Sequence, residues 1–480
     1  MTDFRHLLAE ANWIAGKWSN SGTSRFITVF HKWTQQPLAQ IPLATPKQME
    51  EVIVASETAF EEFRQWSAQD RARILHQLAD LLEKEEEPFA SLICAEAGKP
   101  ISYARGEVAR CLVTLRTAAA ETLRFDGEKV PMDFAAGVGK TAFTRRFPKG
   151  PIACISPFNF PLNLALHKIA PALATGCSVI LKPSPYAPLS SLAFAKLVEQ
   201  TDLPAGALNV LLCDIPEAEH WIKDERMKVL SFTGSPAIGW MLKAKAGKKP
   251  VILELGGNAA VIVDETADLA HTAKRCALGA FLYAGQICIS TQRIYVEQSV
   301  FKQFQELLVK ETRALLSGDP SGEKITNGPL IHQVHLKRIS DWVDHAVEQG
   351  AKVLAGGSVL DEERNLYAPT LLTQTQPHME VVREEAFGPV AILEPYEHFS
   401  EAITTVNDSK FGLQAGVFTQ RIDRMQEAHA KLEVGAVIVN EVPGFRVDSM
   451  PYGGVKESGL GREGIRYTME DYTEPRLLVF

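Results

Sequence analysis

Hydrophobic residues in the first hundred positions recur at the spacing of amphipathic helices. Thr45-Pro46 combines a helix N-cap residue with a first-turn proline, so a helix is expected to begin there. Apolar residues then return every three or four positions, the period of a helix face buried against a core. They are Met49, Val52, Ile53, Ala59, Phe60, Phe63 and Trp66, and in a second helix Ile74, Leu75, Leu78, Leu81 and Leu82. We expect the helical stretch to end near Gly98-Lys99-Pro100.

From about residue 150, short β-branched runs alternate with helical segments. This alternation is typical of parallel sheets covered by helices. A first series comprises residues 151–155, 178–181, 208–212, 229–232, 251–253 and 260–263, and a second comprises 293–296, 390–393, 416–419 and 436–440. The pattern predicts an α/β protein with two Rossmann-like parallel-sheet domains and a cleft between them, where ligand sites are common.

Two segments fit neither series. Residues 122–146 are polar and strand-like, and the C-terminal run Arg476-Leu477-Leu478-Val479-Phe480 is an apolar strand that needs a partner. We predict that 122–146 and 464–480 form a small β oligomerisation arm of a homodimer or homotetramer. The alternative is an edge strand within one chain. The first domain then comprises 1–121 and 147–255, and the second 256–463.

Composition excludes several classes of protein. The 480 residues are 46% hydrophobic and 22% charged, with a formal net charge of −8 and no block of Lys or Arg, so neither nucleic acid nor a membrane is an expected partner. The apolar stretch 162–181 contains His167, Lys168 and Pro171, and is expected to be core. Seven scattered cysteines form no CxxC pair, which indicates a reducing, cytoplasmic compartment and no metal site.

One thiol and one carboxylate lie in Gly-rich contexts. Cys288 follows Gly285-Gln286, and Glu254 precedes Gly256-Gly257, an arrangement that suggests a nucleophile with a base that activates water. A buried cysteine is more often an inert small hydrophobe, as we expect of the other six. The chain contains no G-x-G-x-x-G fingerprint, but Gly234-Ser235 lies between a strand and a helix, where backbone N–H groups suit a pyrophosphate.

Seven runs, in order along nearly the whole chain, resemble the aldehyde dehydrogenase superfamily. They are residues 157–161 (PFNFP), 181–184 (LKPS), 232–235 (FTGS), 254–257 (ELGG), 285–288 (GQIC), 385–390 (EAFGPV) and 451–459 (PYGGVKESG). The resemblance implies that Cys288 attacks an aldehyde, that Asn159 and the Cys288 N–H stabilise the oxyanion, and that Glu254 activates water against a thioester. It implies NAD or NADP as cofactor, an NAD(P)-binding first domain and a catalytic second domain. The implied cofactor residues are Phe158, Lys182, Ser184, Gly234, Ser235, Ile238, Leu255, Glu385 and Phe387.

One departure concerns cofactor choice. Family members often carry a Glu three positions after the lysine, where it pairs with the adenosine ribose, and this chain has Pro185 there. A 2′-phosphate would meet less repulsion, so we hypothesise that NADP is accepted. Family branches that transfer the acyl group to coenzyme A tend to lack the carboxylate of Glu254, so its presence favours a free acid as product.

The substrate remains more open. Asn163 and His167 are one helical turn apart after the asparagine motif, so both could face the aldehyde tunnel. Phe445 and Arg446 precede the 451–459 run, and the guanidinium suits a carboxylate, phosphate or phosphonate. A small hydroxylated or anionic aldehyde is therefore expected, as in the lactaldehyde and non-phosphorylating glyceraldehyde-3-phosphate dehydrogenase-like branch, with succinate-semialdehyde and phosphonoacetaldehyde as alternatives. Arg446 could instead pair with Asp448 or another carboxylate as a structural contact.

Two alternative functions belong to other classes of protein. A cysteine hydrolase would use Cys288 with a histidine, and a non-catalytic binding protein would have kept only the fold. The presence of Cys288, Glu254 and Asn159 together argues against the second rival.

Overall fold

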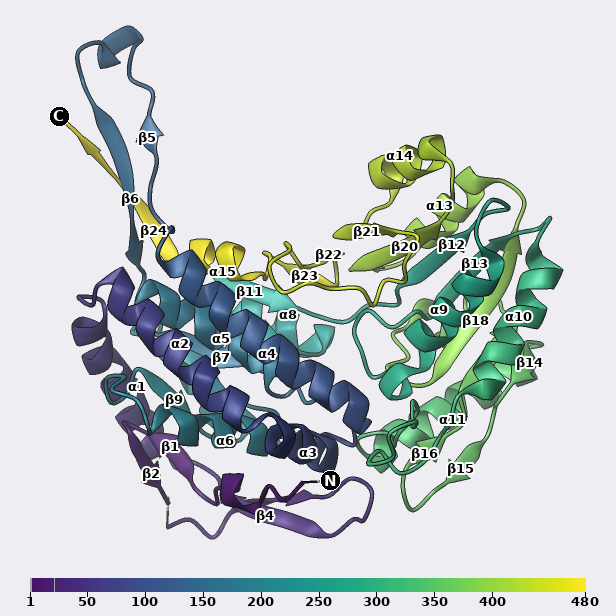
Figure 1. The fold of residues 1–480 in the computed structure, drawn as a ribbon, viewed down its shortest axis with the longest axis horizontal. Coiled ribbons are helices and arrows are strands. Elements are labelled where there is room, and N and C mark those ends of the chain that lie inside the picture. Colours follow the sequence, from purple (N-terminus) through teal and green to yellow (C-terminus); the bar gives the residue numbers. More distant parts are fainter. Residues whose placement is uncertain (1, 21) are drawn as a thin grey trace.

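The chain folds into two α/β units joined side by side, with a slender arm projecting from the first (Figure 1). The computed structural model describes residues 2–20 and 22–480. The sheet of the first unit is parallel from β9 to β11, with antiparallel strands at both edges. Its order is β2 (Lys17–Ser19), β1 (Asn12–Ile14), β9 (Leu208–Val210), β8 (Val179–Lys182), β7 (Ile152–Ile155), β10 (Val229–Thr233), β11 (Val251–Glu254) and β23 (Gly459–Leu460).

The helices of the first unit cover its sheet and confirm the predicted N-terminal signal. Thr45 caps the first helix through reciprocal hydrogen bonds with Gln48. The predicted end of the helical stretch near Gly98 is wrong, because Gly98 (φ +68°) ends α3 only, and a long helix begins directly after Pro100. Pro100 supplies the N-cap there, a position that needs no amide hydrogen. The helices are α1 (Pro46–Phe63), α2 (Ala68–Lys84), α3 (Glu86–Ala97), α4 (Ile101–Thr122), α5 (Asn163–Thr175), α6 (Leu189–Val198), α7 (Ile215–Lys223), α8 (Pro236–Lys245) and α15 (Ile465–Asp471).

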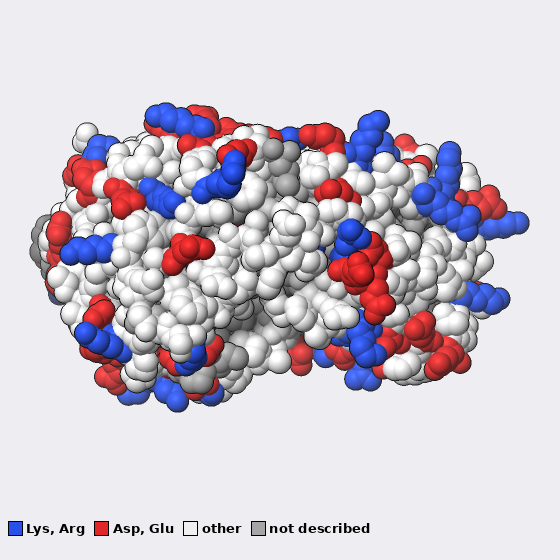
Figure 2. All heavy atoms as spheres, turned by 90° about the horizontal axis from the view of Figure 1, so that it is seen from below, with Lys and Arg blue, Asp and Glu red and all other residues white. Residues whose placement is uncertain are grey.

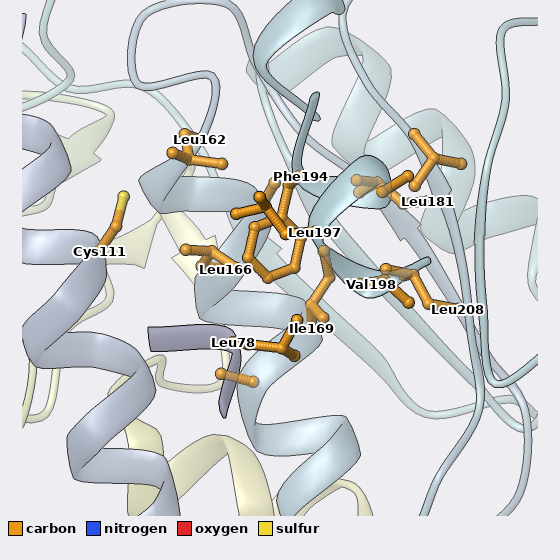
Figure 3. Packing of buried hydrophobic residues seen from close by; sticks show 14 of the residues in the cluster. Leu78, Cys111, Leu162, Leu166, Ile169, Leu181, Phe194, Leu197, Val198 and Leu208 are labelled. Atoms are coloured by element: carbon orange, nitrogen blue, oxygen red, sulfur yellow. The ribbon is translucent and has the colours of Figure 1, made fainter. Parts of the chain in front are cut away.

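Helix α5 is the centre of the main hydrophobic core. All of its residues are buried, including the polar ones. Figure 3 shows Leu166 and Ile169 of α5 against Phe194 and Leu197 of α6. The apolar stretch 162–181 is therefore core, as predicted. None of the helices in the described part of the chain is long and apolar enough to cross a membrane.

The second unit is built on a seven-stranded sheet in which only the edge strand β14 is antiparallel. The run 260–263, counted above with the first series, lies in this sheet as β12. The order is β14 (Lys352–Ala355), β17 (Thr370–Thr373), β18 (Val390–Tyr396), β13 (Arg293–Glu297), β12 (Ala260–Val263), β20 (Gln414–Phe418) and β21 (Ala436–Val439). Its helices are α9 (Leu269–Phe281), α10 (Phe301–Ala314), α11 (Gln333–Glu348), α12 (Glu380–Arg383), α13 (Phe399–Asn407) and α14 (Ile422–Lys431).

Short elements complete the chain. Three two-stranded sheets pair β3 (Phe26–Phe30) with β4 (Pro37–Pro42), β15 (Val359–Asp361) with β16 (Leu366–Tyr367), and β19 (Phe411–Gly412) with β22 (Val455–Lys456). The 3-10 turns are η1 (Arg5–Leu7), η2 (Ala135–Gly137) and η3 (Leu282–Gly285).

The projecting arm pairs the C-terminal strand with its own chain. Strand β24 (Thr473–Val479) runs antiparallel to β6 (Ala142–Pro148), which also pairs with β5 (Lys129–Val130). The tail is thus a strand of a sheet within one chain, as in the alternative stated above, and use of the arm between subunits stays a prediction. Leu477 and Leu478 of β24 are both exposed.

Two segments belong to a different part of the fold from the one that the predicted domain boundaries gave them. Helix α15, within the predicted arm 464–480, buries Ile465 and Met469 in the core of the first unit. Strand β23, within the predicted catalytic segment 256–463, pairs with β11 of the first sheet. Both are too short for a periodic signal, and their burial is decided by the helices and strand that they meet.

Charged side chains of both signs are interspersed on the face seen from below. Figure 2 shows Lys and Arg beside Asp and Glu in scattered groups, many of them around the rim of that face, without a continuous basic patch among the described residues. A mixed surface of this kind does not attract a polyanion over an extended area.

Candidate active site

A cavity of about 850 Å³ lies where the first sheet meets loops of the second unit. It is lined by every residue predicted for catalysis, namely Asn159, Glu254 and Cys288. It is also lined by every residue predicted for the cofactor: Phe158, Lys182, Ser184, Gly234, Ser235, Ile238, Leu255, Glu385 and Phe387. The four predicted substrate residues are not in its lining.

The loop before Cys288 has an unusual backbone. Tyr283, Ala284 and Gly285 all have positive φ (+53°, +53° and +65°), and a Cβ at Gly285 would lie 2.2 Å from the carbonyl oxygen of Gly388. Such a conformation persists only where the surroundings over-determine it. Gln286 helps to do so, because its side chain donates to the carbonyl of Pro329 and accepts from the N–H of Ile331. The loop therefore presents Cys288 in a defined position.

Cys288 differs from the other six cysteines. Those six are buried, whereas Cys288 is partly exposed in the cavity. Its Sγ lies 2.9 Å from the hydroxyl of Tyr452. Burial raises the pKa of the Cys288 thiol to about 11, while the Tyr452 hydrogen bond lowers it. This balance leaves the thiol neutral at neutral pH in the free protein.

Glu254 ends strand β11 inside the same cavity. It is 2% exposed, and neither carboxylate oxygen has a hydrogen-bond partner among the described residues. Burial, and then the nearby Glu463, raise the pKa of Glu254 well above its ordinary value. The glycine at position 453 leaves space for the Glu254 side chain, since a Cβ there would lie 2.9 Å from Glu254 Oε1. A buried, unpartnered carboxyl in a cavity is the arrangement expected of a general base.

Asn159 is held on both sides of its amide group. Its Nδ2 donates to the carbonyl of Gln286 (2.9 Å), and its Oδ1 accepts from the N–H of Phe160 (3.1 Å). The amide nitrogen carries two hydrogens, of which the described residues use one. The second is free to donate to an oxyanion beside Cys288.

A buried ion pair fixes the chain that follows Asn159. Glu107 Oε1 accepts the N–H groups of Leu162 and Asn163, at the start of α5, and Oε2 lies 2.5 Å from Lys99 Nζ. The ammonium of Lys99 lies 3.5 Å from the ring centroid of Phe160. These contacts link the asparagine motif to α3, α4 and α5.

The other end of the cavity fits a dinucleotide. Ser235 is the N-cap residue of α8, and its side chain makes no capping hydrogen bond. The backbone N–H groups of the first turn, at the positive pole of the helix, are therefore available to a ligand at this end of the cavity. A Cβ at Gly234 would lie 2.6 Å from the Phe232 ring, so only glycine fits. Burial lowers the pKa of Lys182, which lines this end.

Glu385 occupies the middle of the cavity. Its Oε1 accepts the N–H of Gly257 at 3.0 Å, and a Cβ at Gly256 would lie 2.1 Å from Oε2. Burial raises the pKa of Glu385 to about 7. Phe387 packs edge-on against Phe158 at 5.8 Å between ring centroids. This carboxylate and these rings suit a ribose and a nicotinamide.

The predicted substrate residues lie outside the cavity lining, and two of them form part of a buried polar cluster. Asn163 and His167 are fully buried and both contact Asp448, His167 Nε2 at 2.7 Å and Asn163 Nδ2 at 3.4 Å. Arg110 also binds Asp448, at 2.6 Å. The expectation that Asn163 and His167 both face an open tunnel is not met in this structure, because the Asp448 carboxylate draws both side chains toward itself.

Arg446 pairs with the carboxylate of Glu463 and not with that of Asp448, so the alternative of a contact with another carboxylate is met. Its guanidinium carbon lies 3.7 Å from the ring centroid of Tyr452, and its Nη2 lies 3.2 Å from His167 Nδ1 and 3.5 Å from Glu463 Oε2. Its Nε is buried without a partner. Phe445, beside it, is exposed.

Sequence reasoning missed several residues of the site. Tyr452 lies inside the run 451–459, but nothing in that run distinguishes a tyrosine that contacts the nucleophile from one that only packs. Tyr186, His335, Arg338 and Trp342 also line the cavity. They come from loops and from α11, where no motif marked them. Among the described residues, no three His, Cys, Asp or Glu are placed to hold a metal ion.

Comparison with known proteins agrees with this geometry. The model of the aldehyde dehydrogenase family matches residues 18–478, and the chain belongs to that family. A 3-sulfolactaldehyde dehydrogenase from Priestia megaterium is 40% identical over 100% of this chain and 99% of its own. Family members use NAD or NADP, and the architecture is the family's mixed α/β fold with parallel sheets.

Two solved structures are closely similar. Aldehyde dehydrogenase 21 from Physcomitrella patens, in complex with the reaction product succinate, has a TM-score of 0.95 and 39% identity, covering 98% of each chain. Glyceraldehyde-3-phosphate dehydrogenase GapN from Methanocaldococcus jannaschii, complexed with NADP, has a TM-score of 0.91 and 34% identity, covering 95% of this chain and 100% of its own.

Proposed function

We propose that the protein oxidises a small hydroxylated or anionic aldehyde to its carboxylic acid with NAD or NADP. The observation that carries this proposal is the column Arg446–Tyr452–Cys288, with 3.7 Å from guanidinium to ring centroid and 2.9 Å from hydroxyl to Sγ. A permanent positive charge lies one aromatic ring away from the nucleophile. The Arg446 side chain is 6% exposed and does not line the cavity, so its charge would act on a short anionic substrate across the Tyr452 ring.

Arg446 has a structural partner in Glu463 and also an unpartnered donor, and that donor supports a ligand role. Asp448, the expected structural partner, is already bound by Arg110 and His167. Arg446 keeps an unpartnered Nε and only a long contact to Glu463. An arginine fork with a free donor is suited to a carboxylate, sulfonate or phosphate.

The chain's own residues supply each step of the proposed oxidation. The Cys288 thiolate attacks the aldehyde carbon, and the oxyanion accepts from the Asn159 amide and the Cys288 N–H; such a donor is worth about 10²–10³ in rate. Bound NAD(P) supplies the acceptor for the hydride that leaves this carbon. Glu254 then takes a proton from the water that attacks the thioester, and the acid leaves with Cys288 restored. A carboxylate at this place favours hydrolysis over transfer to coenzyme A.

The cofactor residues carry the second part of the proposal. Lys182 and Ser184 would bind the adenosine ribose, the first turn of α8 the pyrophosphate, and Glu385 the nicotinamide ribose. Pro185 also lines this end of the cavity, where a carboxylate would repel a 2′-phosphate. We therefore include NADP among the cofactors accepted.

An aldehyde panel assayed with NAD and with NADP tests the proposed function. Lactaldehyde, 3-sulfolactaldehyde and succinate semialdehyde should give reduced cofactor with higher kcat/KM than propanal and hexanal. Preference for hexanal would contradict the substrate class. Absence of any aldehyde-dependent reduction, together with cleavage of an ester or amide, would instead favour the cysteine hydrolase. Cys288→Ala should abolish turnover, and activity retained by that variant would contradict the mechanism.

A further inference from the structure

We propose that Tyr452 is a catalytic residue, whose hydroxyl donates a hydrogen bond to Cys288 Sγ and stabilises the thiolate. The inference rests on the proposed function, in which Cys288 is the nucleophile. It gives Tyr452, a residue of the run 451–459 to which no role was assigned from the sequence, a role in the free enzyme before aldehyde binds.

Which atom donates depends on whether Cys288 is a thiol or a thiolate. The two atoms are 2.9 Å apart, a short distance for a sulfur acceptor. A thiol could donate to the phenol oxygen, but a thiolate has no proton, so only Tyr452 can donate to it. Hydrogen bonds to a charged acceptor are roughly twice as strong as neutral ones. The bond therefore favours the thiolate over the thiol.

Tyr452 keeps its proton for this purpose. It is 2% exposed, and burial raises its pKa well above the ordinary tyrosine value, so the hydroxyl stays a donor at neutral and mildly alkaline pH. Backbone hydrogen bonds in both directions join Tyr452 to Glu463, and the Arg446 guanidinium lies over the ring. The hydroxyl is thus fixed from the backbone and from the ring face.

Four groups from three parts of the chain act on the Cys288 thiol. Tyr452 and Arg446, from the loop after β21, lower the pKa of the thiol, whereas Glu385 and Glu254 raise it. Burial raises it more than any of them. Burial and the two carboxyl groups destabilise the thiolate. The Tyr452 hydroxyl, a neutral donor in direct contact with the sulfur, therefore contributes a large share of the stabilisation of the thiolate. The positive charge of Arg446 acts on the thiol from the other side of the Tyr452 ring.

The rate of Cys288 alkylation by iodoacetamide from pH 7 to 10 tests the proposal without any substrate. The thiolate is the reactive form, and the other six cysteines are buried, so the Cys288→Ser variant supplies the background rate. Tyr452→Phe removes one hydroxyl and leaves the ring under Arg446. We expect its rate profile to move to higher pH by about one unit, which is about a tenfold loss at pH 8. With aldehyde, kcat should fall while KM stays unchanged.

Tyr396→Phe is the matched control. Tyr396 is also buried, and its hydroxyl donates to the carbonyl of Val263 at 3.1 Å in the second unit. This variant should lower the melting temperature as much as Tyr452→Phe does but keep the wild-type alkylation profile. An unshifted profile for Tyr452→Phe would overturn the proposal.

Replacement of Tyr452 by 3-fluorotyrosine covers the case in which Tyr452→Phe does not fold. The ring and the hydroxyl remain, and the more acidic phenol is a stronger donor, so the profile should move to lower pH. No movement, or movement to higher pH, would overturn the proposal. Because alkylation needs no aldehyde, this result is independent of the aldehyde panel, whose failure would contradict the proposed function instead.

Discussion

His167 Nε2 lies 2.7 Å from Asp448 Oδ1, in a fully buried contact between α5 and the loop after β21. Burial alone would raise the pKa of Asp448, but hydrogen bonds from His167 and Arg110 lower it far below its usual range. The carboxylate is therefore ionised at every pH at which the protein is handled. It gives the buried polar cluster a fixed negative centre.

Burial, and then the charge of Arg446, lower the pKa of His167 below 6.5. Between the folded and the unfolded pKa, the unfolded chain binds a proton that the folded chain excludes, so stability falls as pH drops below about 6.5. The loss is at most about 1.4 kcal/mol per pH unit. Urea unfolding at pH 5 to 8 should show this slope in the wild type and a smaller one in His167→Gln. Equal slopes would contradict the assignment.

Arg446→Leu should discriminate between aldehydes. Hydrogen bonds to a charged group contribute about 1.5–3 kcal/mol, so KM for anionic aldehydes should rise about 10- to 100-fold, with little change for neutral ones. Steady-state kinetics with succinate semialdehyde and propanal measure the difference. Arg446→Lys, which keeps the charge and loses the fork, should lie between the two. A uniform loss for both aldehydes would favour a structural role for Arg446.

Glu254→Gln should stop the cycle after the hydride has left. Water is no longer activated, so steady-state kcat should fall by about 10²–10⁴-fold while a burst of one reduced cofactor per Cys288 remains. Because burial and the nearby Glu463 raise the pKa of Glu254, the wild-type kcat should increase with pH as the carboxyl ionises. The variant should lose this limb. Stopped-flow absorbance separates the two phases, and a variant without a burst would place Glu254 earlier in the cycle.

Pro185→Glu should change cofactor preference. A carboxylate beside Lys182 and Ser184 would repel the 2′-phosphate, so Kd for NADP should rise about tenfold relative to Kd for NAD. Isothermal titration with each cofactor measures the ratio. Lys182→Met, as a control, should weaken both. Strict NAD preference in the wild type would remove the basis of this prediction.

Glu107→Gln should destabilise the first unit. It leaves the Lys99 ammonium buried without its partner, which costs about 3–5 kcal/mol in comparable pairs. The melting temperature should fall, and the double variant Lys99→Met/Glu107→Gln should recover part of the loss. If the single and double variants melt together, the ion pair contributes little.

Local sequence predicted those features that local physics governs. The Thr45-Pro46 cap and the apolar period after it give α1, and the β-branched runs give the strands of both parallel sheets. The motifs brought Cys288, Glu254 and Asn159 to one cavity because each lies at a strand end or in a loop beside the sheet. Helix α4 was missed, since a proline that stops one helix can also begin the next.

Long-range contacts decided the remainder. The sequence showed that Asn163, His167 and Arg446 were polar residues in apolar company, and it could not show that Asp448 holds the first two while Tyr452 lies under the third. Those partners are about 280 positions away from α5, and nothing in the local pattern encodes which buried polar groups will meet. The sequence by itself thus determined the family and the sheets, and it singled out Cys288 among the seven cysteines. Only the tertiary structure decided which side chains surround Cys288, because a buried polar group forms its hydrogen bonds with whichever partners the fold places within about 3 Å.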